Sequence, residues 1–440
     1  MDINRGIAIL DVGKTNKKLI VFDQNYRIVL EDLETLQETI DEDGFPCEDL
    51  PLLNQWLDRS IKRIGQIPNM AIRAINFSAY GASLVNITRD NQSWGPLYNY
   101  LKPYLPEWRE KFMGRHGAMD RISLESSSPD LGSLNSGMQL YRLSAFNPEY
   151  RRFVRYSLHL PQYLCWYFSG CALSEITSVG CHTMLWDFSR GSYHTWVKEE
   201  KLNYYLAPLH PADRPVISRT NPQKLSFGTG LHDSSAALLP YLKKDREKFV
   251  LISTGTWSIS LNPFNKEPLT ITELESDCLS YLTPYRDQVK ASRFSAGSHH
   301  EEITQRIREC FHRFPNIDQI RFNKEWFYPE EPIKDLHAYH SAEEAYQNLM
   351  RDFVRQQKRS TDLSIGNSGI KKLYVDGGFS RNHIFMQLLA QAYPELDVYA
   401  ATVPQASAIG AAMILESTWN PDPPTMEVVE LRLVPRLCSL

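Results

Sequence analysis

The sequence predicts an α/β protein of two lobes, and three segments far apart in the chain support this prediction. Each segment begins with an apolar stretch typical of a strand and breaks at a tight turn that contains glycine. The segments are Ile7 to Asp23, Val250 to Leu261 and Leu373 to Ile384. They lie near the start, just past the middle and in the last fifth of the chain, an order that indicates two similar lobes around a nucleotide site.

The first segment has the pattern of a β-hairpin whose tip could hold magnesium and phosphate. An acid, a glycine, a hydroxyl residue, an amide and two lysines make up this tip: Asp11, Gly13, Lys14, Thr15, Asn16 and Lys18. Mg²⁺ favours hard oxygen ligands, and amines and hydroxyls donate hydrogen bonds to phosphate oxygens.

The other two segments have turns that suit phosphate and nucleotide. In the second, hydroxyls and free backbone N–H groups lie between two β-rich runs, at Ser253, Thr254, Gly255 and Thr256. In the third, Gly377 and Gly378 come after a strand and before a helical pattern, which lets a ligand approach the backbone closely. Each turn alone is most often only a turn, so the prediction rests on the three together.

Length and composition favour a soluble two-domain enzyme. A chain of 440 residues is too long for one ordinary core, so we expect two domains of about 200 residues. A net charge of −4 argues against a broad basic surface for nucleic acid or an anionic membrane. The apolar runs are shorter than the ~20 residues of a membrane span, and no signal-peptide pattern is present, so we expect a cytoplasmic protein. Seven scattered cysteines without a CxxC pair indicate neither disulfides nor a zinc site.

A polar loop follows the buried strand predicted from Ala71 to Phe77. The loop presents a hydroxyl, a phenol and free backbone at Ser78, Tyr80, Gly81 and Ala82 before a second strand resumes. Such loops at strand ends are common binding sites in α/β proteins.

Further patterns predict helices and a domain boundary. Apolar spacing predicts a helix from Asp49 to Ile64 and several helices from Gly137 to Tyr167, whereas residues 94–135 look irregular. A turn at Gly228 leads into a small-residue helix with Asp233 near its N-terminus, where an acid commonly serves as a cap. The charged run Lys243 to Lys248 marks the expected boundary between an N-terminal domain, 1–244, and a C-terminal domain, 245–440.

At these residues the sequence resembles the FGGY carbohydrate kinases, members of the actin/hexokinase/Hsp70-like ATPase superfamily. The resemblance covers most of the chain and rests on six ordered motifs: Asp11 to Lys18; Leu160 to Leu164 with Ser174 to Ser178 and Asp187; Gly230 to Ala237; Ser253 to Thr256; Asp376 to Asn382 with Gln387; and Gln405 to Ala412. It implies two ribonuclease-H-like domains with an active-site cleft between them. The first would hold a sugar and the second ATP, and the last motif would form a helix that closes the nucleotide lobe.

The resemblance also implies a role for each motif. Asp233 would be the general base that takes a proton from a sugar hydroxyl as it attacks the γ-phosphorus. Asp11 would bind Mg²⁺. The remaining contacts form three sets: Gly13, Lys14, Thr15, Asn16, Lys18, Thr254, Gly255 and Thr256 around the phosphates; Gly377, Gly378, Ser380 and Asn382 beside adenosine; and Ser78, Tyr80, Gly81, Ala82 and His232, together with Asp233, around the sugar.

Other readings of single residues stay open. Asp233 would otherwise be a helix cap, and Asp11 a turn former. Lys14 stands where the family more often has a small hydroxyl residue, so it is either a second phosphate contact or a solvated lysine. His232 beside Asp233 suits a proton relay, a sugar contact or a structural role.

The sugar side departs from the family pattern. The W-x-D arrangement that commonly follows the first sugar loop is not plain in Pro96 to Pro106, where Asn99, Tyr100 and Lys102 stand instead. The stretch His232-Asp233-Ser234 is similar to the His-Asp-Thr of rhamnulokinase-like members, which favours a 6-deoxyketose such as L-rhamnulose or L-fuculose. A pentulose (xylulose or ribulose) or a polyol is the alternative.

Two further function classes are weighed against a kinase. A catalytically silent regulator would bind sugar or nucleotide but would show erosion of the phosphate motifs, and Asp11, Gly255, Gly377 and Asp233 are all present. An Hsp70-like ATPase or phosphohydrolase would use water in place of the sugar, and the sugar-loop match argues against it. The expected ligands are therefore a small sugar, ATP and Mg²⁺, without nucleic acid or membrane, and a homodimer is left open.

Overall fold

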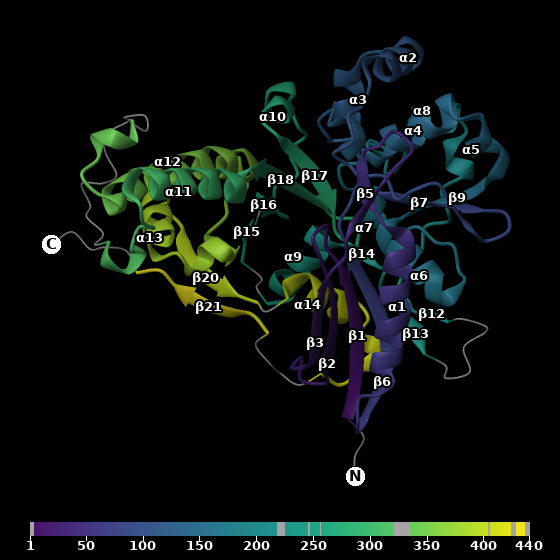
Figure 1. Ribbon diagram of the computed structural model, residues 1–440, viewed down its shortest axis with the longest axis horizontal. Coiled ribbons are helices and arrows are strands. Elements are labelled where there is room, and N and C mark those ends of the chain that lie inside the picture. The colour runs from purple at the N-terminus through teal and green to yellow at the C-terminus, as the bar shows by residue number, and fades with distance from the viewer. Residues whose placement is uncertain are drawn as a thin grey trace.

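A computed structural model describes residues 4–217, 225–244, 247–255, 257–320, 335–403, 405–423 and 428–435. It contains two large mixed sheets with helices on their faces (Figure 1), which confirms the α/β prediction. Within these ranges, no helix is long and apolar enough to cross a membrane.

The first large sheet has the order β12-β13-β6-β1-β2-β3, with β14 also paired to β6. Its strands are β1 (Asn4–Val12), β2 (Asn16–Asp23), β3 (Ile28–Thr35), β6 (Met70–Ala79), β12 (Val216–Ile217), β13 (Ser226–Phe227) and β14 (Leu231–His232). The strands β1, β2 and β3 are antiparallel, and Asp11 lies opposite Lys18. The predicted first hairpin is therefore confirmed. Next to it, β6 runs parallel to β1, and β13 and β14 run parallel to β6.

The second large sheet repeats this plan. Its order is β17-β18-β16-β15-β19-β20-β21, where β18, β16 and β15 are antiparallel and β19 and β20 run parallel to β15. The strands are β15 (Phe249–Thr254), β16 (Ser258–Asn262), β17 (Cys278–Leu282), β18 (Gln288–Phe294), β19 (Lys372–Gly377), β20 (Asp397–Thr402) and β21 (Glu430–Leu433). Three antiparallel strands followed by parallel ones form a ribonuclease-H-like core, so the prediction of two such domains is confirmed.

Helices cover both sheets. In the first lobe, α1 (Leu50–Ile64) begins where Leu52 N donates to the Asp49 carboxylate at 2.9 Å, as the predicted helix start requires. Other helices of the two lobes include α6 (Leu160–Ser169), α9 (Asp233–Lys244), α11 (Ala296–Phe311), α12 (Ala342–Ile365) and α13 (His383–Ala392). The last three bury apolar faces against Val250, Ile252 and Val375 of the second sheet.

The chain returns to the first lobe near its C-terminus. Helices α14 (Ala406–Met413) and α15 (Glu416–Trp419) contact β1 and β6, and α14 packs along α9 (Figure 1). Asn76 of β6 donates to the Ala411 carbonyl at 2.7 Å, and Tyr26 donates to Glu416 at 2.6 Å. The last motif therefore packs on the first lobe instead of closing the nucleotide lobe. The predicted division at 1–244 and 245–440 assigns the two large sheets to different domains, but it also assigns α14 and α15 to the C-terminal domain although they pack on the first lobe. Residues 245 and 246 lie outside the described ranges.

Residues 94–135 differ from the expected irregular segment, because they form α2 (Pro106–His116), α3 (Met119–Glu125) and a short 3₁₀ turn, η1 (Gly132–Leu134). Only Phe112 and His116 of α2 are buried, so its apolar periodicity is too weak to read from the sequence. The interval from Gly137 to Tyr167 contains the expected helices α4 (Ser136–Phe146), α5 (Pro148–Phe153) and α6. A strand that was not expected, β9 (Val154–His159), lies between α5 and α6.

Strand β9 pairs with β7 (Leu84–Thr88), which also pairs with β8 (Ser93–Trp94). Its partner is distant in sequence, so local periodicity does not reveal the strand. The remaining short elements are β4 (Glu38–Ile40), β5 (Pro46–Glu48), α7 (Ile176–Val179), β10 (Trp186–Asp187), β11 (Ser192–Tyr193), α8 (Thr195–Glu199) and α10 (Ile271–Glu275), with 3₁₀ turns at Leu202–Tyr204, Ile317–Gln319, Leu336–Ala338 and Gly378–Arg381.

Candidate active site

Asp233 is the first residue of α9 and directly follows β14. Strand β14 pairs with the end of β6, where His232 lies opposite Ala79, so Asp233 emerges beside the predicted sugar loop. Its carboxylate accepts a hydrogen bond from Ser234 N at 2.6 Å and lies 3.3 Å from His232 Nε2. The side chain is 36% exposed. The carboxylate is thus oriented by its neighbours and still accessible, as a general base requires.

The motif around Glu175 holds His232 in place. The backbone N–H of His232 donates to Thr177 Oγ1 at 3.0 Å, and the Thr177 hydroxyl in turn donates to the Glu175 carboxylate. Glu175 is fully buried, and burial raises its pKa to about 7. This chain of hydrogen bonds gives the Ser174 to Ser178 motif a structural role, because it positions the residue next to Asp233.

The Pro161 motif supports the same turn. Gln162 Nε2 donates to the Gly230 carbonyl at 2.9 Å, and Gly230 has a φ of +84°. A Cβ at Gly230 would lie 2.5 Å from the Pro161 carbonyl oxygen, so glycine is required for both conformation and space.

Asp11 lies at the end of β1 and shares the site with Asp233. It is 8% exposed, and its Oδ2 accepts a hydrogen bond from Ser407 of α14 at 3.0 Å. Burial, and then the nearby charge of Asp233, raise the pKa of Asp11, while Lys18, Ser78 and Ser407 act in the opposite direction. Two carboxylates that repel each other across one space, both hard oxygen ligands, fit a divalent cation such as Mg²⁺.

The other residues of the first hairpin tip differ in what they contact. Lys18 Nζ donates to Gln405 Oε1 at 2.7 Å, next to Ser407. Lys14 forms an ion pair with Glu38 and lies 3.6 Å from Glu48, so its ammonium is not a free solvated group. Thr15 is exposed at the turn. Asn16 accepts a hydrogen bond from Thr35 at 3.1 Å, and Gly13 N donates to the Asn16 carbonyl at 2.9 Å, which closes the turn.

The second-lobe turns meet each other at the ends of β15 and β19. Thr254 Oγ1 donates to the Asp376 carbonyl at 2.5 Å and accepts from Phe379 N at 3.0 Å. A Cβ at Gly377, where φ is +87°, would lie 1.9 Å from the Thr254 carbonyl oxygen. The Thr254 hydroxyl therefore joins the two turns, while Gly255, Gly377 and Gly378 leave their backbone exposed to a ligand. Thr256 lies outside the described residues.

The two remaining residues of the predicted adenosine edge shape the turn. Ser380 is buried and donates to the Gly377 carbonyl at 2.8 Å. Asn382 caps α13 by accepting from Ile384 N and Phe385 N, and its Nδ2 donates to Tyr346 at 2.7 Å. Their side chains hold the turn that presents the two glycines.

The structure brings the predicted sugar loop next to His232. Ser78 is fully buried and its hydroxyl has no hydrogen bond of normal geometry, although it lies near Asp11. Tyr80 packs edge-on against Tyr100 with ring centroids 5.8 Å apart. A Cβ at Gly81 would lie 3.0 Å from the His232 ring, so glycine allows this close approach. Ala82, in a left-handed conformation with φ of 67°, accepts from Gln139 at 2.6 Å.

Several residues of the site were not expected from the sequence. His182 packs edge-on against His232, and Tyr281 of β17 contacts both rings at centroid distances of 6.1 and 5.3 Å. Burial and then the charge of Arg293 hold the pKa of His182 well below its usual value. No local motif marks these residues, because β17 and β18 reach the first lobe only through tertiary folding.

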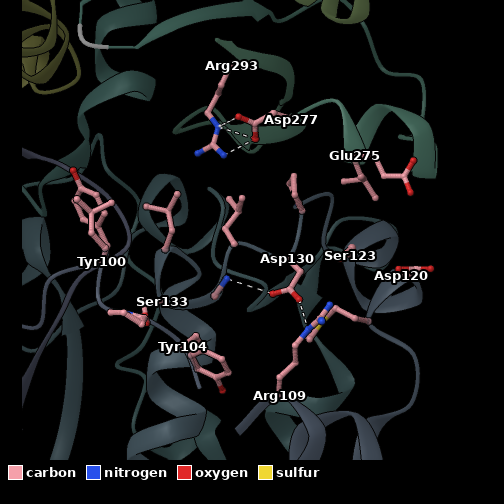
Figure 2. A pocket seen from close by; sticks show the side chains of 18 of the residues that line it. Tyr100, Tyr104, Arg109, Asp120, Ser123, Asp130, Ser133, Glu275, Asp277 and Arg293 are labelled. Carbon is pink, nitrogen blue, oxygen red and sulfur yellow. Dashed lines mark hydrogen bonds and ion pairs between the residues drawn. The ribbon is translucent and has the colours of Figure 1, made fainter. Parts of the chain in front are cut away.

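A cavity of about 700 Å³ opens beside this cluster, between the 94–135 insertion and the second lobe (Figure 2). Tyr100, Tyr104 and Ser133 line one side, and Asp277 and Arg293, paired at 2.5 Å, line the other (Figure 2). Burial and then the charge of Asp233 raise the pKa of Tyr100. Asp233 thus lies near the Tyr100 wall, which makes the cavity part of an interdomain cleft.

Comparisons with known proteins agree with this geometry. Residues 319–418 match the C-terminal domain of the FGGY family of carbohydrate kinases. A solved carbohydrate kinase from Novosphingobium aromaticivorans has a TM-score of 0.78 and 22% identity over 99% of this chain and 95% of that chain. A xylulose kinase from Lactobacillus acidophilus gives 0.78 and 13% over 97% and 92%. A glycerol kinase from Plasmodium falciparum gives 0.70 and 13% over 93% and 89%. No curated protein matches the sequence.

Proposed function

We propose that this chain, whose residues 319–418 match the C-terminal domain of the FGGY carbohydrate kinases, transfers the γ-phosphate of ATP to a ketose hydroxyl with Asp233 as the general base. The observation that carries the proposal is the place of Asp233. It lies at the start of α9, 3.3 Å from His232, near Asp11 and beside a cleft between the lobes.

The reaction uses the two acids differently. Asp233 takes the proton of the acceptor hydroxyl, whose oxygen forms a bond to the γ-phosphorus. The bond between this phosphorus and the β–γ bridging oxygen breaks, and ADP leaves. Asp11 would hold Mg²⁺, which supplies charge stabilisation to the phosphates when bound. Ser407 orients Asp11 by donating a hydrogen bond to its carboxylate. Lys18, which donates a hydrogen bond to Gln405, neutralises charge at this end of the site.

The phosphates and adenosine would contact backbone groups more than side chains in the second lobe. Gly255, Gly377 and Gly378 expose their backbone, whereas Thr254, Ser380 and Asn382 use their side chains to hold the turns. The opposite wall of this proposed site belongs to the first lobe and consists of Gly13, Lys14, Thr15, Asn16 and Lys18. Closure of the lobes would exclude water from the transfer.

The acceptor that we favour is a 6-deoxyketose, L-rhamnulose or L-fuculose. The support is the His232-Asp233-Ser234 stretch, whose His232 lies beside the sugar loop. A pentulose is the alternative, since similar solved structures include xylulose kinases. Ser78, Tyr80, Gly81, Ala82 and His232 would surround either sugar. We also propose a cytoplasmic protein, for which a homodimer is left open.

The test compares Asp233→Asn with the wild type in a coupled assay of ADP release, with ketopentoses, 6-deoxyketoses and polyols as acceptors. Loss of the base lowers kcat about 10²–10⁴-fold on the best acceptor. Asp90→Asn is the matched control, because Asp90 is exposed in the turn between β7 and β8, outside the proposed site, and its variant keeps wild-type turnover. Unchanged turnover in Asp233→Asn removes this residue from the mechanism. ADP release that no sugar or polyol increases supports a regulator or a phosphohydrolase instead.

A further inference from the structure

His182 is a buried histidine whose hydrogen-bonding capacity is unused. It is 7% exposed, and neither Nδ1 nor Nε2 has a hydrogen-bond partner. Among the residues that the structure describes, no other histidine has both ring nitrogens buried and unpaired. Buried polar atoms without partners are costly, so a group that pairs with this ring is expected from outside the protein.

The free edge of this ring faces the sugar loop. A Cβ at Gly81 would lie 3.2 Å from His182 Cε1, the carbon between the two ring nitrogens, and 3.0 Å from His232 Nε2. Both histidine rings therefore pack against one side of Gly81, a half-buried residue of the sugar loop. Because His232 Nε2 also lies 3.3 Å from Asp233, the two rings lie next to the place proposed for the reacting hydroxyl.

The chemistry of the ring suits a hydroxyl. Burial, Arg293 and His232 hold the pKa of His182 well below its usual value, so the ring is neutral and has one N–H donor and one acceptor nitrogen. A hydroxyl group also both donates and accepts. An anion gains little from a neutral ring, and the neighbouring Tyr281 makes only an edge-on ring contact with His182, at a centroid distance of 6.1 Å.

A metal ion is the other ligand class that these residues suggest. Ligand atoms of Cys181, His182 and His232 lie within 4.8 Å of one another. However, Cys181 Sγ donates to the Ser178 carbonyl at 3.3 Å, and burial raises the pKa of its thiol to about 12, whereas metals bind the thiolate. His232 Nε2 already faces Asp233. The metal is therefore the less favoured ligand and becomes an outcome of the test.

We propose that His182 is a specificity-determining residue that hydrogen-bonds one hydroxyl of the acceptor sugar, on a carbon other than the one phosphorylated. The inference rests on the proposed function, since it concerns the same acceptor site. It predicts that the sugar must carry a hydroxyl at this position, in the orientation that reaches the ring.

The experiment combines variants of His182 with deoxy analogues of the best acceptor. The wild type prefers the acceptor over one particular deoxy analogue by about 10⁴–10⁵-fold in kcat/KM, because a site built for a hydroxyl rejects the analogue that lacks it. In His182→Leu this preference falls to about 10-fold or less for that analogue, and preferences at the other positions stay as in the wild type. His182→Asn keeps a donor and an acceptor and retains part of the preference.

A second readout is independent of turnover. Calorimetry without ATP gives the affinity for acceptor and analogue, and the same loss of discrimination is expected in His182→Leu. His194→Leu is the matched control: His194 is also buried, but its nitrogens are paired with Glu125 and with Trp196 N, so its variant lowers stability without changing the preference.

The inference is overturned if an active wild type and His182→Leu show the same preferences at every position. It is also overturned if one Zn²⁺ per chain binds the wild type and is lost in both Cys181→Ser and His182→Leu. A wild type that neither binds nor phosphorylates any acceptor contradicts the proposed function itself, which separates the two failures.

Discussion

Gly410 of α14 lies directly against the carbonyl of Ala236 in α9, so closely that a Cβ on Gly410 would be 1.8 Å from that oxygen. Helix α9 carries Asp233 in its first turn, and α14 carries Ser407, which donates to Asp11 at 3.0 Å. One helix pair therefore positions both acids of the site, although its members are far apart in sequence.

The Gly410→Ala variant tests this helix pair. The added methyl group forces α9 and α14 apart, which lowers the free energy of unfolding by about 1–3 kcal/mol. It also displaces Asp233, and a shift of about 1 Å in a reacting group can cost about 100-fold in rate. Urea denaturation and kcat measure the two effects.

Gly114→Ala is the control for the helix pair. Gly114 also lies inside a helix, α2, but a Cβ there has nothing within 4 Å. Alanine is a better helix former than glycine, so the free energy of unfolding of this variant rises by up to about 1 kcal/mol and its activity is unchanged. Equal stability of Gly410→Ala and the wild type would show that α9 and α14 do not pack as described.

Asp11→Asn separates stability from metal binding. The folded protein raises the pKa of Asp11, so this side chain favours folding most below its unfolded pKa of about 3.9, and the contribution is lost as the pH rises through the folded pKa. At pH 7 the buried charge is unfavourable, and the neutral amide removes it. Without metal, we therefore expect Asp11→Asn to melt about 1–2 °C above the wild type.

Magnesium is expected to reverse the order of the two melting temperatures. A cation that binds only the folded state raises the melting temperature with its concentration, and the wild type is expected to respond while Asp11→Asn does not. Thermal melts in EDTA and at increasing Mg²⁺ measure both parts. An equal rise with Mg²⁺ in the two proteins would contradict the role of Asp11 as the metal ligand.

His159 predicts a loss of stability in mild acid. It is 2% exposed, its Nε2 is 2.9 Å from the Ser136 hydroxyl, and burial followed by the charge of His232 lowers its pKa to about 3. Below the unfolded pKa of about 6.5, the unfolded chain binds a proton that the folded protein does not. The free energy of unfolding then falls by about 1.4 kcal/mol per pH unit, or about 2 kcal/mol at pH 5.

His159→Gln removes this titration. Urea denaturation at pH 8, where histidine is neutral in both states, gives the cost of lost packing. Between pH 8 and pH 5 the variant is then expected to lose about 2 kcal/mol less than the wild type. The same pH dependence in both proteins would show that His159 takes up a proton in the folded state.

Local patterns predicted much of the fold and part of the site. The hairpin that places Asp11 opposite Lys18, the turn at Gly377 and the position of Asp233 at the start of α9 all follow from short-range signals. Alternating apolar residues and turn-forming glycines act over a few residues, so a single sequence shows them.

Longer-range features were missed or misplaced for a common reason. Strand β9 is stabilised by β7, and α2 buries little of its own surface, so neither has a strong local pattern. His182 becomes part of the site only because Tyr281 and Arg293 of the second lobe approach it.

The sequence by itself determined the two lobes, the glycine turns and an acid at the start of a helix, because strand period, glycine conformation and helix capping are local properties. Only the tertiary structure decided that α14 returns to the first lobe, that Ser407 orients Asp11 and that His182 faces Gly81. These contacts join residues distant in the chain, and their free energy comes from packing and burial that exist only after the lobes have formed.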